Sequence, residues 1–410
     1  MSRPEAKVIV VGAGPAGATL AHLLASRGIS VTLLERHRDF NREFRGEVLL
    51  PSGLKALQQM GLGDLITRIP HVVPTSFELY SNARLSLRIP FHPHLAGPGP
   101  LIALSQPAFL AAVIERARAF PSFRVELGVA ASELLLTGGR VTGLKVRSST
   151  GERILHSDLV IGADGRNSTI RKACALKARK HGMDFDVVWF KTALPVSFRH
   201  ESPFRGHIGH GHLLIAYPAA GGSLQVAWLI AKGSYGELRH RGMTEWIEEM
   251  AQHVTPDLGS HLRTHSRSLA NPFLLSTVSD RVTPWSIPGA LVIGDAAHTM
   301  SPVGAQGINM ALRDAVVAAN RLIPVLRQTR DCDRILAATQ AIEDDRTPEL
   351  RYIQRLQAIQ PRIVLSRSLG AAAFRATVPR LLRFEAVRRA AASIGLGNIL
   401  FGWGDVRLQV

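Results

Sequence analysis

The 410-residue chain contains only two cysteines and no long hydrophobic run. Cys174 and Cys332 are far apart and form no pair with the spacing of a metal site, so we expect a reducing, cytoplasmic setting. Residues 1–6 are short and polar, and we expect no secretory signal there. No apolar stretch approaches the roughly 18–20 residues of a membrane-spanning helix. What remains is an ordinary globular composition, in a chain long enough for two interlocked domains.

Acidic residues are scarce relative to basic ones, because 32 aspartates and glutamates face 49 lysines and arginines. The imbalance is strongest in residues 351–410, where ten arginines accompany only Glu385 and Asp405. No helix-turn-helix, zinc-finger or RNA-recognition signature accompanies this charge, so we expect no nucleic-acid partner. Two explanations stay open. One is a solvated basic helical face; the other is peripheral contact with an anionic membrane or an acidic protein, because apolar residues alternate with the arginines.

The sequence does contain a glycine-rich turn directly after an apolar run. Gly12, Gly14 and Gly17 have G-x-G-x-x-G spacing, and residues 18–27 continue with a helical pattern. Gly12 permits a tight turn, Gly14 lets the backbone approach a pyrophosphate, and Gly17 lets the helix pack against the sheet. A second apolar run ends at Glu35, whose carboxylate can accept hydrogen bonds from an adenosine ribose. The segment predicts dinucleotide binding without identifying the dinucleotide.

Two later segments also place an acidic residue at the end of an apolar run. Residues 158–171, DLVIGADGRNSTIR, predict a strand, a tight turn and a helix capped by Ser168, which alone is an ordinary connection. Residues 291–298, LVIGDAAH, place Asp295 at a strand end, and the loop at 301–307 then enters a helix with a bare N-terminus. Backbone N–H groups there can stabilise negative charge on a flat heterocycle, and Asp295 can bind hydroxyl groups. A ribityl chain beside a ring that becomes reduced fits both requirements.

The other segments predict a discontinuous domain with a β-rich insertion. An amphipathic helix is predicted over 106–118, and short strands broken by glycines over 124–162 predict a small meander. From residue 307 the pattern is mainly helical, with breaks expected at Pro361 and Pro379. Strand-like runs in the middle of the chain lie at 186–194, 213–218 and 224–230, the last two joined by a Gly221-Gly222 hairpin turn.

Together the three motifs resemble the single-component (group A) FAD-dependent aromatic monooxygenases of the para-hydroxybenzoate hydroxylase type, within the glutathione-reductase-like FAD proteins. The resemblance rests on GAGPAG with its following acid, GADGRNSTIR and GDAAHTMSPVGAQGINMALRDA, and it covers roughly residues 5–330. It implies an α/β fold with a Rossmann FAD-binding domain, an inserted substrate-binding β-sheet domain and a basic helical C-terminal region. The implied boundaries are 1–75, 100–178 and 275–340 for the first, 76–99 and 179–274 for the second, and 341–410 for the third.

The resemblance also implies FAD as the cofactor. Gly12, Gly14, Gly17 and Glu35 would hold its ADP half, and Arg45 would reach toward the flavin or the pyrophosphate. Pro15, Ala16 and Arg36 are implied beside the ADP half, Gln106 elsewhere on FAD, and Gly294 and Asp295 at the ribityl chain or pyrophosphate. Pro302, Gly304, Gln306, Gly307 and Asn309 would lie along the isoalloxazine, whereas Asp164 and Gly165 have a less settled role with FAD or the nicotinamide cofactor.

In enzymes of this family NADH or NADPH reduces FAD, O2 adds to give a C4a-hydroperoxide, and its distal oxygen passes to an electron-rich substrate. The sequence has no second G-x-G-x-x-G, so the nicotinamide would bind transiently. Strand alternation allows only about half of the apolar residues of the inserted strands to face the flavin, the others packing the domain's own core. The implied catalytic residues are Arg45, Pro302 and Tyr217, and the pocket candidates are Trp189, Leu213, Ile215, Tyr217 and Trp228.

No general base is assigned by the sequence, and no metal is expected. The histidine-rich stretch at 207–212 lacks a carboxylate or thiolate at helix spacing. The inserted domain also lacks an arginine–tyrosine cluster for a small benzoate, so we expect a larger, mainly hydrophobic aromatic or polycyclic substrate. The candidate bases are Tyr217, His207, His210 and His212, and the arginines that a carboxylate could recruit are Arg199 and Arg205.

Three other functions stay open. Flavin halogenases share the fold and FAD but carry a W-x-W-x-I-P segment, of which residues 285–288 supply only half. A flavin-dependent reductase or oxidase would use the same cofactors without inserting oxygen. A non-catalytic FAD-binding protein would use its basic tail to bind a partner. Neither the oligomeric state nor the choice between NADH and NADPH is predicted.

Overall fold

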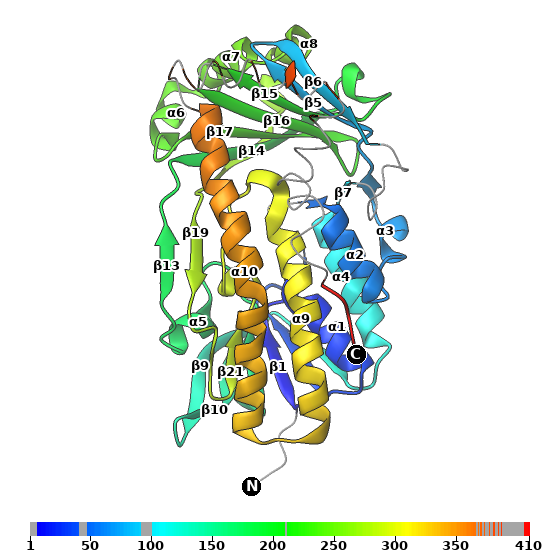
Figure 1. Ribbon diagram of the computed structural model, residues 1–410, viewed down its shortest axis with the longest axis vertical. Helices are drawn as coiled ribbons and strands as arrows, with labels where there is room; N and C mark the ends of the chain where they lie inside the picture. Colours follow the sequence, from blue (N-terminus) through cyan, green and yellow to red (C-terminus); the bar gives the residue numbers. More distant parts are fainter. Residues whose placement is uncertain are drawn as a thin grey trace.

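The computed structural model describes residues 6–40, 47–91, 101–209, 211–365 and 406–410, with isolated positions between 366 and 387. Two halves are stacked along the long axis of the molecule, and helix α10 (Cys332–Leu365) runs from one half to the other (Figure 1). One half is built around a mainly parallel sheet with helices, and the other around a mainly antiparallel sheet. The predicted α/β fold is therefore confirmed.

The first half contains a six-stranded sheet whose strands pair in parallel except at one edge. The registers place Val11, Gly162 and Val292 side by side, so the three predicted motifs leave the sheet at the same edge. In spatial order the strands are β20 (Ser286–Ile287), β21 (Ala290–Val292), β12 (Leu159–Gly162), β1 (Val8–Val11), β2 (Val31–Glu35) and β8 (Phe123–Leu127).

Helices α1 (Pro15–Ser26), α4 (Gln106–Arg118) and α9 (Gln306–Gln328) pack together over the six-stranded sheet. The predicted meander is smaller than expected, because the apolar run of β12 is buried on both faces and belongs to the parallel sheet, as does β8. What remains as a meander is a three-stranded sheet formed by β9 (Ala130–Thr137), β10 (Arg140–Ser148) and β11 (Gly151–His156).

The second half is a seven-stranded sheet whose one face is covered by three helices (Figure 1). The predicted hairpin is present between β16 (His212–Ala219) and β17 (Ser223–Ala231), and Gly221 and Gly222 both have a positive φ in its turn. The helices are α6 (Tyr235–Arg241), α7 (Met243–Gln252) and α8 (Pro256–Thr264). The strands, in spatial order, are β18 (Ala270–Leu275), β14 (Phe185–Ala193), β17 (Ser223–Ala231), β16 (His212–Ala219), β15 (Phe204–Gly209), β5 (Ser76–Ser81) and β6 (Arg84–Pro90).

Small elements connect the halves. A three-stranded sheet of β3 (Val48–Leu49), β7 (Ile102–Leu104) and β4 (His71–Val72) lies beside helices α2 (Pro51–Gln59) and α3 (Leu65–Arg68). At the other side, β13 (Ala178–His181) pairs with β19 (Ser279–Val282), and helix α5 (Thr169–Ala173) follows β12 (Figure 1).

The C-terminal region differs in part from expectation. Helix α10 continues through Pro361 to Leu365, so no break occurs at Pro361, whereas Pro379 lies outside the described residues. Residues 406–410 form neither a helix nor a strand, and the Leu408 N–H donates to Gln59 Oε1 at 2.6 Å. None of the helices among the described residues is long and apolar enough to cross a membrane. Five of the ten arginines in residues 351–410 lie outside the described residues, and the role of this basic stretch stays a prediction.

Candidate active site

The glycine turn after β1 is fixed by backbone contacts that leave no room for side chains. A Cβ on Gly17 would lie 2.0 Å from the carbonyl oxygen of Gly12, and a Cβ on Gly12 would lie 2.5 Å from that of Ala163. A Cβ on Gly14, in contrast, would meet nothing within 4 Å. Helix α1 starts at Pro15 without a side-chain cap, so its first N–H groups face the space beside Gly14. This turn therefore has the geometry that an anion such as a pyrophosphate could occupy.

Glu35 at the end of β2 lies against the same turn. Its carboxylate is 3 % exposed and accepts hydrogen bonds from the Ala13 N–H at 2.9 Å and from the His37 N–H at 3.0 Å. These bonds hold the acid beside the glycine turn, where an adenosine ribose is predicted. Arg36, the next residue, is exposed.

The second motif uses its acid to start a helix. Asp164 accepts hydrogen bonds from the Thr169 and Ile170 N–H groups at 2.6 and 3.2 Å, and Ser168 Oγ accepts one from the Arg171 N–H, as the predicted cap requires. These contacts give the Asp164 carboxylate a structural role at the start of α5. Contact between Asp164 and a cofactor stays a prediction. Gly165 has a φ of +81°, and a Cβ there would meet nothing within 4 Å.

The third motif meets the first two at the sheet edge. Gly294 has a φ of +59°, and a Cβ there would lie 3.0 Å from the Cβ of Ala16 in α1. Asp295 follows and is about one-third exposed. Arg166 from the second motif donates to its carboxylate at 3.4 Å. The Asp295 carboxylate therefore borders the open edge, where hydroxyl groups of a ligand can reach it.

The loop from Pro302 to Gly307 ends in an uncapped helix start. Ala305, in the left-handed conformation with a φ of +53°, is the N-cap of α9 and offers no side-chain bond, and a Cβ on Gly307 would meet nothing within 4 Å. Asn309 fastens this turn to β3, because its side chain donates to the carbonyls of Ala305 and Val48 and accepts from the Leu50 N–H at 2.9 Å. The first N–H groups of α9 thus form a second anion-stabilising surface.

One face of the seven-stranded sheet, here called the inner face, turns toward this loop. Trp189 and Tyr217 form one apolar cluster with Val48 and Leu50, and Val303 and Ala305 of the loop pack against that cluster. Leu213 and Ile215 pack against it as well. Tyr217 is stacked on Phe204 with ring centroids 4.9 Å apart. Four of the five predicted pocket residues therefore share an apolar, aromatic wall beside the loop: Trp189, Leu213, Ile215 and Tyr217.

Comparison with known proteins agrees with this geometry. A family described as "FAD binding domain" matches residues 5–344. The chain belongs to this family. It is 34% identical to 6-methylpretetramide 4-monooxygenase of Streptomyces rimosus over 95% of this chain and 92% of that protein. It is 28% identical to squalene monooxygenase SE2 of Panax ginseng over 85% of this chain and 64% of that protein. The chain is thus an FAD-dependent monooxygenase that uses NAD(P)H.

Solved structures show the same fold. The p-nitrophenol 4-monooxygenase PnpA of Pseudomonas putida superposes with a TM-score of 0.82 at 19% identity and covers 99% of this chain and 100% of that chain. PqsL of P. aeruginosa, in complex with 2-aminobenzoylacetate, gives a TM-score of 0.76 at 18% identity, over 90% of this chain and 99% of that chain. At these identities the likeness concerns the fold alone.

The edge residues of the monooxygenase fit FAD. A Cβ on Gly14, Gly165 or Gly307 would meet no atom of the described residues within 4 Å, and both α1 and α9 begin without a side-chain cap. The first can hold the pyrophosphate, and the second can face the isoalloxazine. When bound, FAD supplies electron transfer from NAD(P)H to O2 and the transfer of oxygen to substrate. Arg45, which the resemblance assigns to FAD and to catalysis, lies outside the described residues, and Gln106 is the half-buried first residue of α4.

A buried ionic network that the sequence analysis missed holds the third motif in place. Asp314 of α9 accepts hydrogen bonds from the Gly294 N–H at 3.0 Å, from His298 Nε2 at 2.6 Å and from Arg346 of α10 at 2.7 Å. Arg346 also pairs with Glu349, which binds Arg313 at 2.9 Å. Burial alone would raise the pKa of Asp314, but His298 and Arg346 outweigh it and hold that pKa at about 2. The sequence signal for this network is the ALRDA segment at the end of the third motif, because it contains Arg313 and Asp314.

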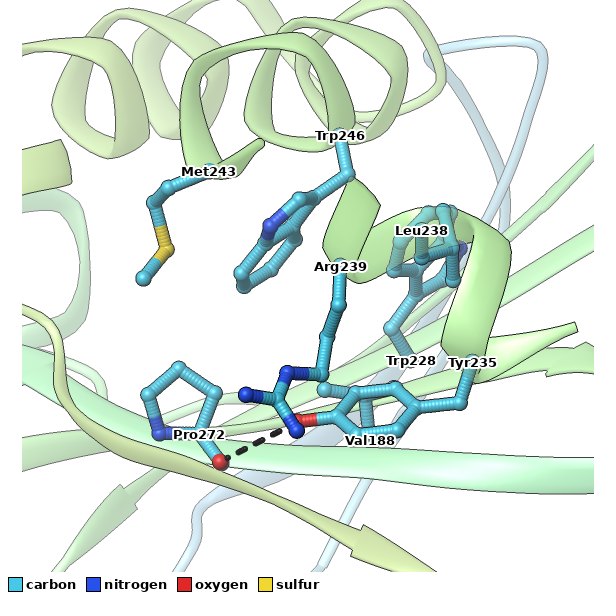
Figure 2. Close-up of a pocket in the computed structure, with 8 residues that line it drawn as sticks. All are labelled: Val188, Trp228, Tyr235, Leu238, Arg239, Met243, Trp246 and Pro272. Atoms are coloured by element: carbon cyan, nitrogen blue, oxygen red, sulfur yellow. Dashed lines mark hydrogen bonds between the residues drawn. The ribbon is translucent and has the colours of Figure 1, made fainter. Parts of the chain in front are cut away.

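Trp228 does not line the inner wall, and its predicted place beside the flavin is wrong. Because residues alternate along β17, Trp228 points to the opposite, outer face of the sheet and stacks on Trp246 of α7 with ring centroids 6.0 Å apart. Figure 2 shows it at a separate outer cavity of about 460 Å³. That cavity is lined by Val188, Trp228, Tyr235, Leu238, Arg239, Met243, Trp246 and Pro272.

Three of the four candidate bases are not suited to that role. Tyr217 is buried, and burial raises its pKa well above the usual range, so it stays a neutral phenol. His207 is buried against Tyr80, and burial lowers its pKa to about 3. His212 stacks on Trp228 at the outer face, and His210 lies outside the described residues. The proposed catalytic role of Tyr217 is thereby limited to shaping the wall.

The two arginines considered for a carboxylate also lie elsewhere. Arg205 donates to Glu78 at 2.9 Å and pairs with Asp257 of the outer helices, whereas Arg199 is exposed. Residues 285–288, which match half of the halogenase segment, have a structural role. Trp285 is fully buried and packs with its ring 5.3 Å from that of His298.

A matched pair of substitutions distinguishes the two faces. We expect Trp189→Phe to raise KM for an aromatic substrate several-fold, because it removes part of the inner wall, while Tm changes little. We expect Trp228→Phe to lower Tm without changing KM, because it loosens the stack with Trp246. Steady-state kinetics and thermal unfolding measure both effects. An equal rise of KM in the two variants would contradict the assignment of faces.

Proposed function

We propose that this monooxygenase hydroxylates a large, hydrophobic, polycyclic phenol that lies between the inner wall and the Pro302–Gly307 loop. The observation that carries the proposal is the wall itself: Trp189, Tyr217 and Phe204 place aromatic rings next to the loop. Flat rings bind such surfaces by stacking and apolar burial. No arginine among the described residues of the wall offers a clamp for a small carboxylate.

The similarity to a relative named for 6-methylpretetramide supports the same class of substrate. In this proposal the half of the molecule with the six-stranded sheet, formed by residues 1–75, 100–178 and 275–340, holds FAD. It does so through the glycine turn, Glu35, Asp295 and the start of α9. The second half positions the substrate and keeps water away from the reacting atoms, because its inner face is apolar.

The test is product analysis under ¹⁸O₂ with NADH or NADPH. The panel contains 6-methylpretetramide, 1-anthrol, squalene, p-nitrophenol and 4-hydroxybenzoate. We expect labelled oxygen in the products of the polycyclic phenols, with nearly one NAD(P)H consumed per product. Coupled turnover restricted to 4-hydroxybenzoate or p-nitrophenol would overturn the substrate class. NAD(P)H consumption without labelled product from any compound would instead indicate a reductase or oxidase.

A further inference from the structure

A group of polar side chains interrupts the apolar inner wall. Lys191 on β14 lies opposite Gln225 on β17, and Gln225 lies opposite Tyr217 on β16, so the three share one face of the sheet. Glu47, directly before β3, reaches this row from the other side, and its Oε1 lies 3.5 Å from Lys191 Nζ. The Glu47 side chain is almost entirely buried, at 5 % exposure.

Two acceptor atoms in this group have no hydrogen-bond partner among the described residues. They are Glu47 Oε2 and Gln225 Oε1, and Gln225 is fully buried. A buried acceptor without a donor is destabilising, because it has lost the hydrogen bonds that water would give it. Such atoms beside a substrate wall indicate that a donor from a ligand completes them, and a hydroxyl group is the simplest such donor.

Glu47 also lies close to the predicted flavin loop. Its neighbours Val48 and Leu50 belong to the cluster of the inner wall, and Val303 and Ala305 of the loop pack against that cluster. Asn309 binds the backbone of Val48 and Leu50 and so fixes this segment to the start of α9. The carboxylate is therefore held between the loop and the wall, where the substrate ring is placed.

We propose that Glu47 is the general base that takes the proton from the substrate's hydroxyl group, and that Lys191 is a positioning residue for it. The inference rests on the proposed function. The O–H bond of the phenol breaks, its electron pair stays on the phenolate oxygen, and the proton forms an O–H bond with Glu47 Oε2. The phenolate makes the ring carbons more nucleophilic toward the transferred oxygen. Lys191 is about one-third exposed and connects the buried carboxylate with solvent.

The ionisation of the carboxyl is consistent with this role. Burial raises the pKa of Glu47 to about 7, and the nearby Lys191 ammonium opposes that rise. Among the described residues, the titratable groups that face it are Lys191 from β14 and Tyr217 from β16. A base with a pKa near the working pH combines a sizeable ionised fraction with useful basicity.

The first test is the pH dependence of hydroxylation with 1-anthrol. For the wild type we expect kcat/KM to rise with pH through a midpoint near 7, as Glu47 loses its proton. Glu47→Gln should lower kcat about 10²–10⁴-fold and remove this rise, whereas Glu47→Asp should retain the rise. Lys191→Met should move the midpoint to higher pH, because the cation that lowers the pKa of Glu47 is gone.

Two further measurements separate catalysis from structure. For 4-nitro-1-naphthol, which is already ionised at pH 8, Glu47→Gln should cost less than about threefold, because no proton has to be removed. Infrared difference spectra of the oxidised enzyme between pH 5.5 and 8.5, without NAD(P)H, should show a carboxyl band that titrates near pH 7 and is missing in Glu47→Gln. As a control, Glu78→Gln changes a buried carboxylate that pairs with Arg205 at the outer face, and it should keep the rise.

The outcomes distinguish the two proposals. A wild-type enzyme that hydroxylates 1-anthrol, with the same pH dependence in Glu47→Gln, would overturn the base role alone. An equal loss of activity with 1-anthrol and 4-nitro-1-naphthol would also overturn it, since that pattern indicates damage to the site. Failure of the wild type to insert labelled oxygen into any phenol would overturn the proposed function and the base role with it.

Discussion

Arg346→Leu is expected to destabilise the chain by about 3–5 kcal/mol, because it leaves Asp314 and Glu349 as buried carboxylates without their shared partner. Asp314 also holds the Gly294 N–H, so the variant should lose FAD affinity together with stability. Urea unfolding followed by circular dichroism measures the first effect, and flavin absorbance after gel filtration measures the second.

The same two helices offer a matched control. Arg321 of α9 pairs with Asp345 of α10 at 2.8 Å, but both side chains are more than one-third exposed. Arg321→Leu should therefore cost less than about 1 kcal/mol. Similar losses in the two variants would contradict the importance of burial.

The pH dependence of the Arg346 effect has a defined sign. The pKa of Asp314 is held at about 2, below the roughly 3.9 of an unfolded chain. Its contribution to stability is complete above about pH 4 and is lost as the pH falls toward 2. The difference between wild type and Arg346→Leu should shrink in that acid range.

Gly17→Ala and Gly14→Ala should fail in different ways. A Cβ at position 17 would lie 2.0 Å from the Gly12 carbonyl oxygen, so Gly17→Ala must separate α1 from β1 and should greatly lower Tm even without FAD. A Cβ at position 14 meets no protein atom within 4 Å, and Gly14 has a φ of −74° that alanine adopts freely. Gly14→Ala should fold with an unchanged Tm as apoprotein.

FAD affinity completes the comparison. If the pyrophosphate occupies the space beside Gly14, Gly14→Ala should weaken FAD binding about 100-fold, which is about 2.7 kcal/mol. Fluorescence titration of the apoprotein with FAD measures this loss, and thermal unfolding of the two apoproteins measures the change in Tm. Normal FAD affinity in Gly14→Ala would contradict the placement of the pyrophosphate.

The sequence predicted the nucleotide half well because its signals are local. A strand, a glycine turn and a helix start depend on neighbouring residues, and parallel pairing then brings Gly12, Ala163 and Gly294 to one edge. The small helices α6–α8 and the pairing of β8 with the parallel sheet were not predicted. Both depend on packing between segments that are distant in sequence, which local patterns do not show.

The substrate half shows where local patterns stop being informative. Alternation tells that neighbouring residues in a strand point to opposite faces, but it does not tell which face meets the loop. Trp189 and Trp228 are therefore indistinguishable in sequence and separate only in the folded sheet. Glu47 was missed for a similar reason: an acid before an apolar strand is ordinary until Lys191, far along the chain, is placed beside it.

Helix α10 joins the Pro302–Gly307 loop to the sheet of the substrate half. It contacts strands β15 and β16 of the substrate half, and its Gln357 donates to the carbonyls of Ser301 and Val303 at the flavin loop. The position of this loop relative to the inner face therefore depends on one continuous helix, visible along the molecule in Figure 1.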